Sequence, residues 1–187
     1  MPVKPKVSAI LSELEKNQVY LDEEQLDKMV HCIMTANYIF TAGSGRSGVA
    51  IRAFTNRLMH LGYPVSLIGE ITTPHSTPGD VLIIGSGSGE TESLVALAKK
   101  AAKQGVRIVL VTMDDQSSIA QLASVVVVLP GVSPKLKNKG MNIHSVQPMG
   151  SAFEQMMFFV FDGIVLELME RTGQTSENMF QRHADFE

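Results

Sequence analysis

The sequence predicts an α/β protein of the doubly wound type, with a mainly five-stranded parallel sheet and helices on both faces in three layers. Two observations support this fold class. The strand segments 108–111 and 125–128 are apolar throughout, which is typical of parallel strands that are covered on both sides. In addition, two other apolar runs, 38–40 and 81–84, lead into glycine–serine turns that open helical segments.

Two helices, 7–20 and 22–36, are expected as an N-terminal extension ahead of the sheet. Asp22 fits the N-cap of the second helix, and Gln25, three residues later, completes a capping-box pattern. The other elements are then expected in this order: strand 38–41, helix 47–61, strand 64–68, strand 80–84, helix 89–104, strand 107–112, short helix 117–123, strand 125–129, loop 130–148, helix 150–172 and a polar tail.

The composition indicates one compact domain that spans residues 1–187. It comprises the N-terminal helices (1–36), a sheet core that carries both turns (37–129), and the long helix with its tail (150–187). With 187 residues and 44% hydrophobic content, the chain can bury a core without disulfides, and the single Cys32 is expected to be a packed thiol.

The charge pattern excludes several classes of partner. The formal net charge is −3 and no basic stripe is present, which argues against nucleic acid. The apolar runs are too short to span a bilayer, and the basic N-terminus lacks the apolar core of a secretory signal. We therefore expect a cytoplasmic protein with no membrane partner.

The two glycine–serine turns, 41–48 and 85–91, are the main functional signal. Glycines allow a sharp turn and close approach to a ligand, and the first turn of the following helix offers free N–H groups to an anion. Two such turns at the carboxyl ends of parallel strands predict a site for a phosphorylated metabolite. The candidate binding residues are Ser44, Arg46, Ser47, Ser86, Gly87, Ser88, Gly89, Glu90 and Thr91.

Other interpretations of these turns stay open at this point. Each serine alone is also compatible with a simple helix cap. The spacing Gly43-x-Gly45-x-x-Gly48 formally matches a dinucleotide-binding fingerprint, with Glu70 near the position of its acidic residue. The second serine-rich turn favours a phosphorylated metabolite, because a dinucleotide site does not require it.

Several segments together resemble a known family. The two turns resemble the phosphosugar loops of sugar isomerase (SIS) domains, which have a flavodoxin-like fold. Three further segments resemble the 6-phospho-3-hexuloisomerases within that family, namely Arg52–Gly62, Gln147–Gln155 and Asn178–Ala184. The resemblance implies isomerisation of D-arabino-hex-3-ulose 6-phosphate to D-fructose 6-phosphate, in the ribulose monophosphate pathway of formaldehyde fixation. It also implies a homotetramer. We expect no metal or cofactor, because His31, His75 and His144 have no metal-ligand spacing to each other.

Moving the carbonyl from C3 to C2 requires a base that removes the C2 proton and returns a proton to C3. Glu154 is the candidate base, since it lies near the start of the last helix, although a carboxylate there also fits a favourable interaction with the helix dipole. Asp162 is the rival carboxylate, and we expect an interior or interface hydrogen bond for it.

Two histidines are candidates for sharing the proton transfers with Glu154. His60 equally fits a favourable position at a helix C-terminus, and the sequence leaves open which histidine acts. His183, beside Arg182, is expected to reach a neighbouring subunit's site.

The long helix 150–172 carries apolar residues around nearly its whole circumference. One face packs on its own domain, so the remaining face needs a second subunit or the N-terminal helix pair 7–36 as a cover. This pattern, together with the resemblance, predicts a homo-oligomer.

Two alternatives to the expected reaction remain. One is a related isomerase of the arabinose 5-phosphate or sedoheptulose 7-phosphate type, which would share the phosphate loops. The other is a non-catalytic phosphosugar sensor. Residues 1–36 are too short and too acidic for the helix-turn-helix that such regulators carry.

Overall fold

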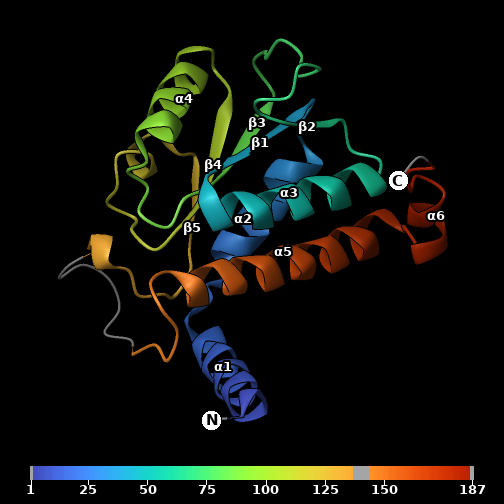
Figure 1. The fold of residues 1–187 in the computed structure, drawn as a ribbon. Helices are drawn as coiled ribbons and strands as arrows, with labels where there is room; N and C mark the ends of the chain where they lie inside the picture. The colour runs from blue at the N-terminus through green and yellow to red at the C-terminus, as the bar shows by residue number, and fades with distance from the viewer. Residues whose placement is uncertain (1, 137–143, 186–187) are drawn as a thin grey trace.

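The computed structural model describes residues 2–136 and 144–185, and it confirms the three-layer α/β fold (Figure 1). The five strands are β1 (Ile39–Gly43), β2 (Val65–Leu67), β3 (Val81–Gly85), β4 (Arg107–Thr112) and β5 (Val125–Val128). All pair in parallel, in the spatial order β2-β1-β3-β4-β5. This is the flavodoxin-like order, whose switch point lies between β1 and β3.

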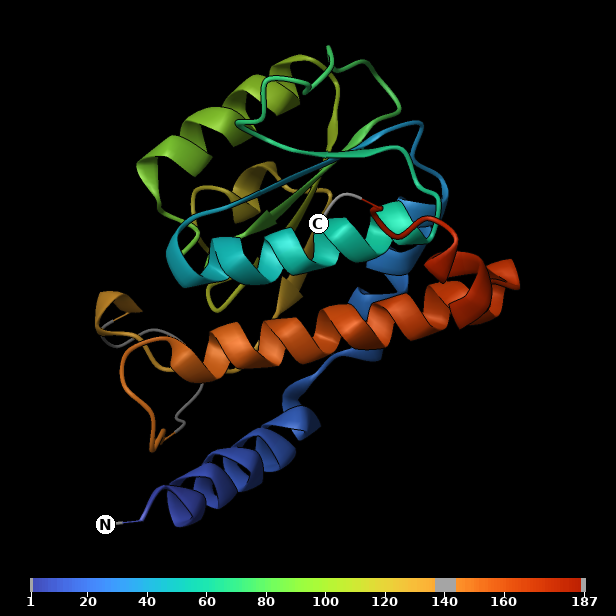
Figure 2. The same ribbon diagram turned by 45° about the vertical axis from the view of Figure 1, so that its right-hand side comes forward.

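Helices cover both faces of this sheet. They are α1 (Val3–Asn17), α2 (Glu23–Met34), α3 (Gly45–His60), α4 (Glu92–Lys103), α5 (Ser151–Thr172) and α6 (Ser176–Phe180), with single 3₁₀ turns η1 (Gln18–Tyr20), η2 (Ala120–Leu122) and η3 (Pro134–Leu136). Figures 1 and 2 show α4 on one face and α2 and α3 on the other, with α5 lying outside α3.

Each face of the sheet has its own hydrophobic core. Ile84, Leu94 and Leu110 are buried on the α4 side. Ile83 belongs to the larger core on the other side, which continues through α2 and α3 to Phe161 of α5. Successive strand residues point to opposite faces, so an apolar run feeds both cores, as the sequence predicted.

Asp22 caps α2 as predicted, but Gln25 does not complete a capping box. The Asp22 carboxylate accepts hydrogen bonds from the backbone N–H groups of Glu24 (2.9 Å) and Gln25 (3.3 Å). The Gln25 side-chain oxygen instead accepts a bond from the N–H of Val128 on β5, at 2.8 Å. Gln25 therefore ties α2 to the edge strand, a contact that local sequence cannot reveal.

Three helix predictions need correction. α1 begins four residues early, at Val3, because a proline in the first turn, Pro5, costs no intrahelical hydrogen bond. The expected helix 117–123 is reduced to the 3₁₀ turn η2. The helix expected from residue 89 begins only at Glu92, because the turn after β3 extends further than its glycines indicated.

The tail is more ordered than the sequence indicated. It contains α6, whose N-cap Thr175 accepts a bond from the Asn178 N–H, and Met179 is buried. The Arg182 guanidinium then donates to the carbonyl oxygens of His60 (3.0 Å) and Asn178 (3.2 Å). The tail therefore packs over the C-terminal end of α3 in its own chain.

Cys32 lies in the core, as predicted. It is buried in α2, and desolvation raises the pKa of its thiol above the ordinary value, partly offset by the positive charge of Arg107. Separately, none of the described helices combines the length and the hydropathy that a membrane span requires.

Candidate active site

A cavity of about 480 Å³ opens at the carboxyl ends of β1 and β3. The two strands pair in register so that Gly43 lies opposite Gly85, and both turns therefore leave the sheet at the same level. α3 then runs along one face and α4 along the other (Figure 1). The backbone diverges at this point and leaves a crevice, which is where open α/β sheets bind ligands.

The first turn depends on close backbone contact between two glycines. A Cβ on Gly43 would lie 2.9 Å from the Cα of Gly48, and a Cβ on Gly48 would lie 2.9 Å from the carbonyl oxygen of Gly43. Such distances exclude a side chain at either position. This contact sets the start of α3 tightly against β1, and it places Ser44, Gly45, Arg46 and Ser47 along the cavity wall.

The second turn supplies the opposite wall, with Ser86, Gly87, Ser88 and Thr91 lining the cavity. Ser86 is buried, and its backbone N–H donates to the carbonyl of Val111 at 3.0 Å. This bond fixes the turn to the end of β4.

Gly89 and Glu90, also predicted to bind the ligand, do not line the cavity in the part of the chain that the structure describes. The Glu90 carboxylate accepts a bond from the N–H of Ser118 at 2.7 Å. Gly89 has φ +61°, and a Cβ there would lie 1.9 Å from the Ser117 hydroxyl oxygen. The backbone N–H groups of both residues are engaged within the loop, with the Ser86 carbonyl (3.1 Å) and the Ser88 hydroxyl (3.3 Å). Their visible role is to shape the turn.

The N-cap residues of α3 and α4 differ from those of α2 and α6 in their hydrogen bonds. Ser44 and Thr91 occupy these positions, but neither side chain makes a capping hydrogen bond. Asp22 and Thr175 do cap α2 and α6 in this way. The two hydroxyl groups that face the cavity are therefore not used to stabilise their own helices, and the simple-cap interpretation does not account for them.

Glu154 lines the same cavity, where its carboxylate forms an ion pair with the Arg46 guanidinium. The Glu154 side chain is 19% exposed and Arg46 is 63% exposed, so the pair lies at the mouth with the carboxylate on the inner side. The two residues are 108 positions apart in sequence and belong to the first turns of α5 and α3. The site thus places one carboxylate and one guanidinium beside a row of hydroxyl groups.

Sequence reasoning did not assign the other residues that line the cavity, which come from α4, from the loops after β4 and β5, and from the start of α5. These residues are Leu94, Met113, Ser133, Pro134, Met149, Gly150 and Phe153. Among the described residues other than glycine, Met149 is the one with a positive φ, +52°. This conformation is uncommon outside glycine and asparagine. Strained backbone of this kind often accompanies functional sites. Met149, Gly150 and Phe153 fall in the segment Gln147–Gln155 that resembles the family, whereas no local pattern marks the others, because these segments meet only in the folded chain.

The two predicted histidines come together, but away from this cavity. The rings of His60 and His183 stack with their centroids 5.4 Å apart. They lie at the C-terminal end of α3, whereas Ser47 and Arg46 lie at its N-terminal end. Sixteen helical residues span about 24 Å at a rise of roughly 1.5 Å each. The histidines of a chain therefore do not reach the Glu154 of the same chain.

Asp162 is exposed, so the expected interior hydrogen bond is wrong for the single chain. It faces a second cavity, of about 420 Å³, which Arg57, His60 and His183 also line. Glu70, which a dinucleotide site would require, is exposed and does not line the cavity at the β1–β3 switch point.

Comparison with known proteins accords with this geometry. The sequence profile of the SIS domain matches residues 33–160, from the end of α2 to the middle of α5. The chain belongs to the SIS domain family. The matched segment contains the whole sheet, both glycine–serine turns and Glu154.

Relatives within the SIS domain family include curated isomerases. The chain is 42% identical to the 3-hexulose-6-phosphate isomerase of Bacillus subtilis, over 97% of each chain. It is 36% identical to the 3-hexulose-6-phosphate isomerase of Mycobacterium gastri, over 97% of this chain and 89% of that one. A crystal structure from Methanococcus jannaschii, for which the function of a 3-hexulose-6-phosphate isomerase was inferred, superposes with a TM-score of 0.83 at 29% identity. The match covers 98% of this chain and 99% of that one.

The unused N-cap hydroxyls lead to a prediction about stability. Ser44→Ala should lower the free energy of unfolding by less than about 0.5 kcal/mol, because no capping bond is lost. The matched change Asp22→Ala removes two such bonds and should cost about 1 kcal/mol. Urea unfolding followed by circular dichroism measures both. Equal losses for the two variants would mean that Ser44 does serve as a cap.

Proposed function

We propose that the protein is an isomerase that converts D-arabino-hex-3-ulose 6-phosphate to D-fructose 6-phosphate, in the ribulose monophosphate pathway of formaldehyde fixation. The observation that carries this proposal is the cavity at the β1–β3 switch point, where unused hydroxyls of two helix N-termini face an inner carboxylate. The 42% identity to a curated 3-hexulose-6-phosphate isomerase, over nearly the whole of both chains, supports it. The cytoplasmic location expected from the sequence stays a prediction.

The hydroxyl-lined end of the cavity binds the phosphate group in this proposal. Ser47, Ser86, Ser88 and Thr91 line it, and the N-termini of α3 and α4 converge there. Both helix dipoles favour a dianion at this point, and hydroxyl and backbone N–H groups donate to its oxygens. The phosphate is unchanged in the reaction, so these contacts hold the sugar in one orientation throughout.

Glu154 is the base in this proposal. It removes the proton from C2, and the electrons form a C2–C3 enediolate. The hydroxyl proton then moves from O2 to O3, and Glu154 returns its proton to C3 as the carbonyl forms at C2. The Arg46 guanidinium, already beside the carboxylate, stabilises the negative charge that develops on the enediolate oxygen. The 3-keto substrate would close only a four-membered ring with O5, and O6 carries the phosphate, so it enters in the open-chain form.

The histidines act across a subunit boundary in this proposal. His60 and His183 lie too far from Glu154 of their own chain, so a neighbouring subunit supplies them to the site.

α5 offers a surface for such a neighbour. The outer face of α5 exposes Phe158 (41%), Phe159 (56%) and Leu166 (66%), although the opposite face of this helix packs on α3 and α2. The N-terminal helix pair, the alternative cover, lies along only part of α5. We propose a homo-oligomer, with the tetramer taken from the family resemblance.

The direct test measures turnover on a panel of sugar phosphates. The kcat/KM for D-arabino-hex-3-ulose 6-phosphate should exceed the values for arabinose 5-phosphate and sedoheptulose 7-phosphate by at least about tenfold, because the carboxylate must lie over one particular C–H bond. A coupled assay for fructose 6-phosphate measures the first reaction. Preference for another sugar would assign the related isomerase activity. Binding without any turnover would indicate a sensor.

Replacing the base separates binding from chemistry. Glu154→Gln should lower kcat by roughly 10²–10⁴-fold, because an amide of the same shape cannot accept the C2 proton, while fructose 6-phosphate still binds. Glu170→Gln is the matched control, since Glu170 is exposed on the same helix and lies outside the cavity. Steady-state kinetics and calorimetry provide the two measurements. A loss of less than about tenfold in kcat would move the role to another residue.

Mixing two inactive variants tests the shared site. Glu154→Gln and His60→Ala should each be inactive alone, yet their co-expressed mixture should regain up to about a quarter of wild-type activity. A shared site takes Glu154 from one chain and His60 from another. In a random mixture of the two variants, about a quarter of the sites therefore receive both residues intact. Kinetics on the purified mixed oligomer gives the result. A mixture as inactive as its parents would contradict the shared site, and an active His60→Ala parent would remove His60 from catalysis.

A further inference from the structure

α1 carries one continuous apolar stripe, but the chain covers only its second half. Val3, Val7, Leu11 and Leu14 follow each other at spacings of three and four residues, which places them on one side of the helix. Leu14 is buried against the domain, whereas Val3 is 72%, Val7 48% and Leu11 56% exposed. The stripe therefore continues past the edge of the domain.

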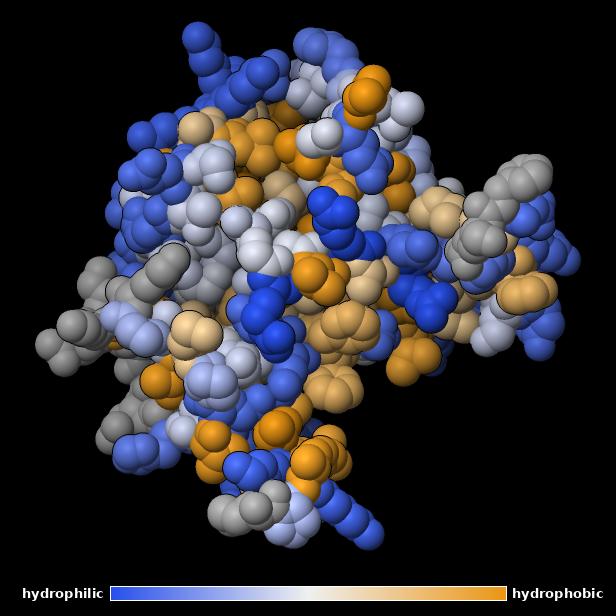
Figure 3. Space-filling view, in the orientation of Figure 1, coloured by the Kyte–Doolittle hydropathy of each residue, from blue (hydrophilic) through white to orange (hydrophobic). Residues whose placement is uncertain are grey.

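The exposed half of α1 projects away from the rest of the molecule. Figures 1 and 2 show the N-terminal end of α1 extending beyond α5, and in Figure 3 hydrophobic side chains gather along this projection. All of residues 2–9 are exposed. A short helix with half of its apolar face in water is marginal without packing. The first two turns of α1 thus need a cover that the described chain does not supply.

A groove of about 500 Å³ lies between α1, α2 and α5. Its floor is apolar and includes Leu14, Val30, Phe159 and Ile164. Phe159 is 56% exposed, so this floor is open to a partner. The groove begins at Leu11, where the covered and uncovered parts of the stripe meet. It is therefore continuous with the apolar surface that needs a cover.

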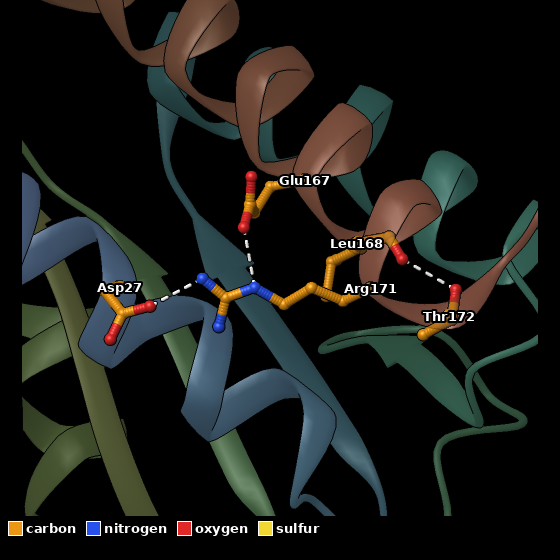
Figure 4. Close-up of polar contacts among 5 residues, drawn as sticks. All are labelled: Asp27, Glu167, Leu168, Arg171 and Thr172. Atoms are coloured by element: carbon orange, nitrogen blue, oxygen red, sulfur yellow. Dashed lines mark hydrogen bonds and ion pairs between the residues drawn. The ribbon is translucent and has the colours of Figure 1, made fainter.

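The charges of the two surfaces are opposite. Among the described residues, the groove is lined by the acidic residues Glu15, Glu23, Asp27 and Glu167 and by one cation, Arg171. Figure 4 shows the Arg171 guanidinium between Asp27 and Glu167, to which it donates at 2.7 and 2.6 Å, so its charge is already compensated. The projecting segment 2–12 carries Lys4 and Lys6 and no acidic residue.

We propose that the first two turns of α1 lie in the α1–α2–α5 groove of a second copy of this chain, and that the exchange is reciprocal. Val3 and Val7 then meet the apolar floor, and Lys4 and Lys6 meet the acidic rim. Such a contact is self-complementary about a twofold axis, with Leu11 of each copy near the axis because it belongs to both surfaces. The contact specifies one interface of the oligomer proposed above and rests on that proposal.

One pair of variants tests the apolar part of the contact. Val7→Asp places a charge on the stripe, and Ala9→Asp places the same charge on the opposite side of the same helix, where Ala9 is exposed. Sedimentation equilibrium should show that Val7→Asp weakens association by at least about tenfold, while Ala9→Asp assembles like the wild type. Circular dichroism checks that both remain folded.

A charge exchange tests the polar part. Lys4→Glu/Lys6→Glu and, separately, Glu15→Lys/Glu23→Lys should each weaken association, because like charges then face each other. The variant that carries all four changes should have an association constant within about threefold of the wild-type value, since every charge pair is attractive again. Glu15 and Glu23 suit this exchange because neither forms an ion pair within the described residues.

The outcomes separate the two proposals. A monomeric wild type would overturn the oligomer itself. An oligomer that Val7→Asp leaves unchanged, or that Ala9→Asp disrupts equally, would overturn only the α1 contact. Failure of the fourfold variant to reassemble would also overturn it, because the pairing of lysines with the acidic rim would then be incorrect.

Discussion

The in-register parallel pairing of β1 with β3 is the constraint on which the rest of the molecule depends. Because Gly43 lies opposite Gly85, two turns leave the sheet side by side, and their helices pass to opposite faces. The backbone cannot fill the space between diverging helices, so a crevice forms there. Two helix N-termini converge on the crevice, which gives it a positive electrostatic character without a buried side-chain cation among the described residues that line it.

The same arrangement accounts for the way the turns use their polar groups. Gly89, Glu90 and Ser117 are occupied with holding the second turn in shape, whereas Ser44 and Thr91 forgo capping bonds. A helix normally gains stability from its N-cap, so this chain gives up some stability at α3 and α4. The gain is two hydroxyl groups that stay available to a ligand. Stability and ligand binding thus compete for the same few side chains, at the point where the sheet topology creates the crevice.

α5 links this crevice to the surfaces that remain uncovered. Its first turn contributes Glu154 to the site, its middle packs on α3 and α2, and its outer face leaves Phe158 and Leu166 in contact with solvent. Assembly through that face would therefore act on the same helix that carries the carboxylate. α1 shows the same pattern, because one half of its apolar stripe packs on the domain and the other half is exposed.

The sequence alone determined the features that depend on neighbours in the chain. The strands, the two turns and the Asp22 cap follow from runs of a few residues, since hydrophobic periodicity and capping act locally. The tertiary structure decided how Gln25 reaches β5, why Glu90 turns to Ser118, and which loop residues, such as Met149, close the cavity. It also placed His60 beside His183 at the far end of α3 from Glu154. These outcomes depend on contacts between segments far apart in sequence, and a side chain's choice among several possible partners is fixed only when packing brings one of them within reach.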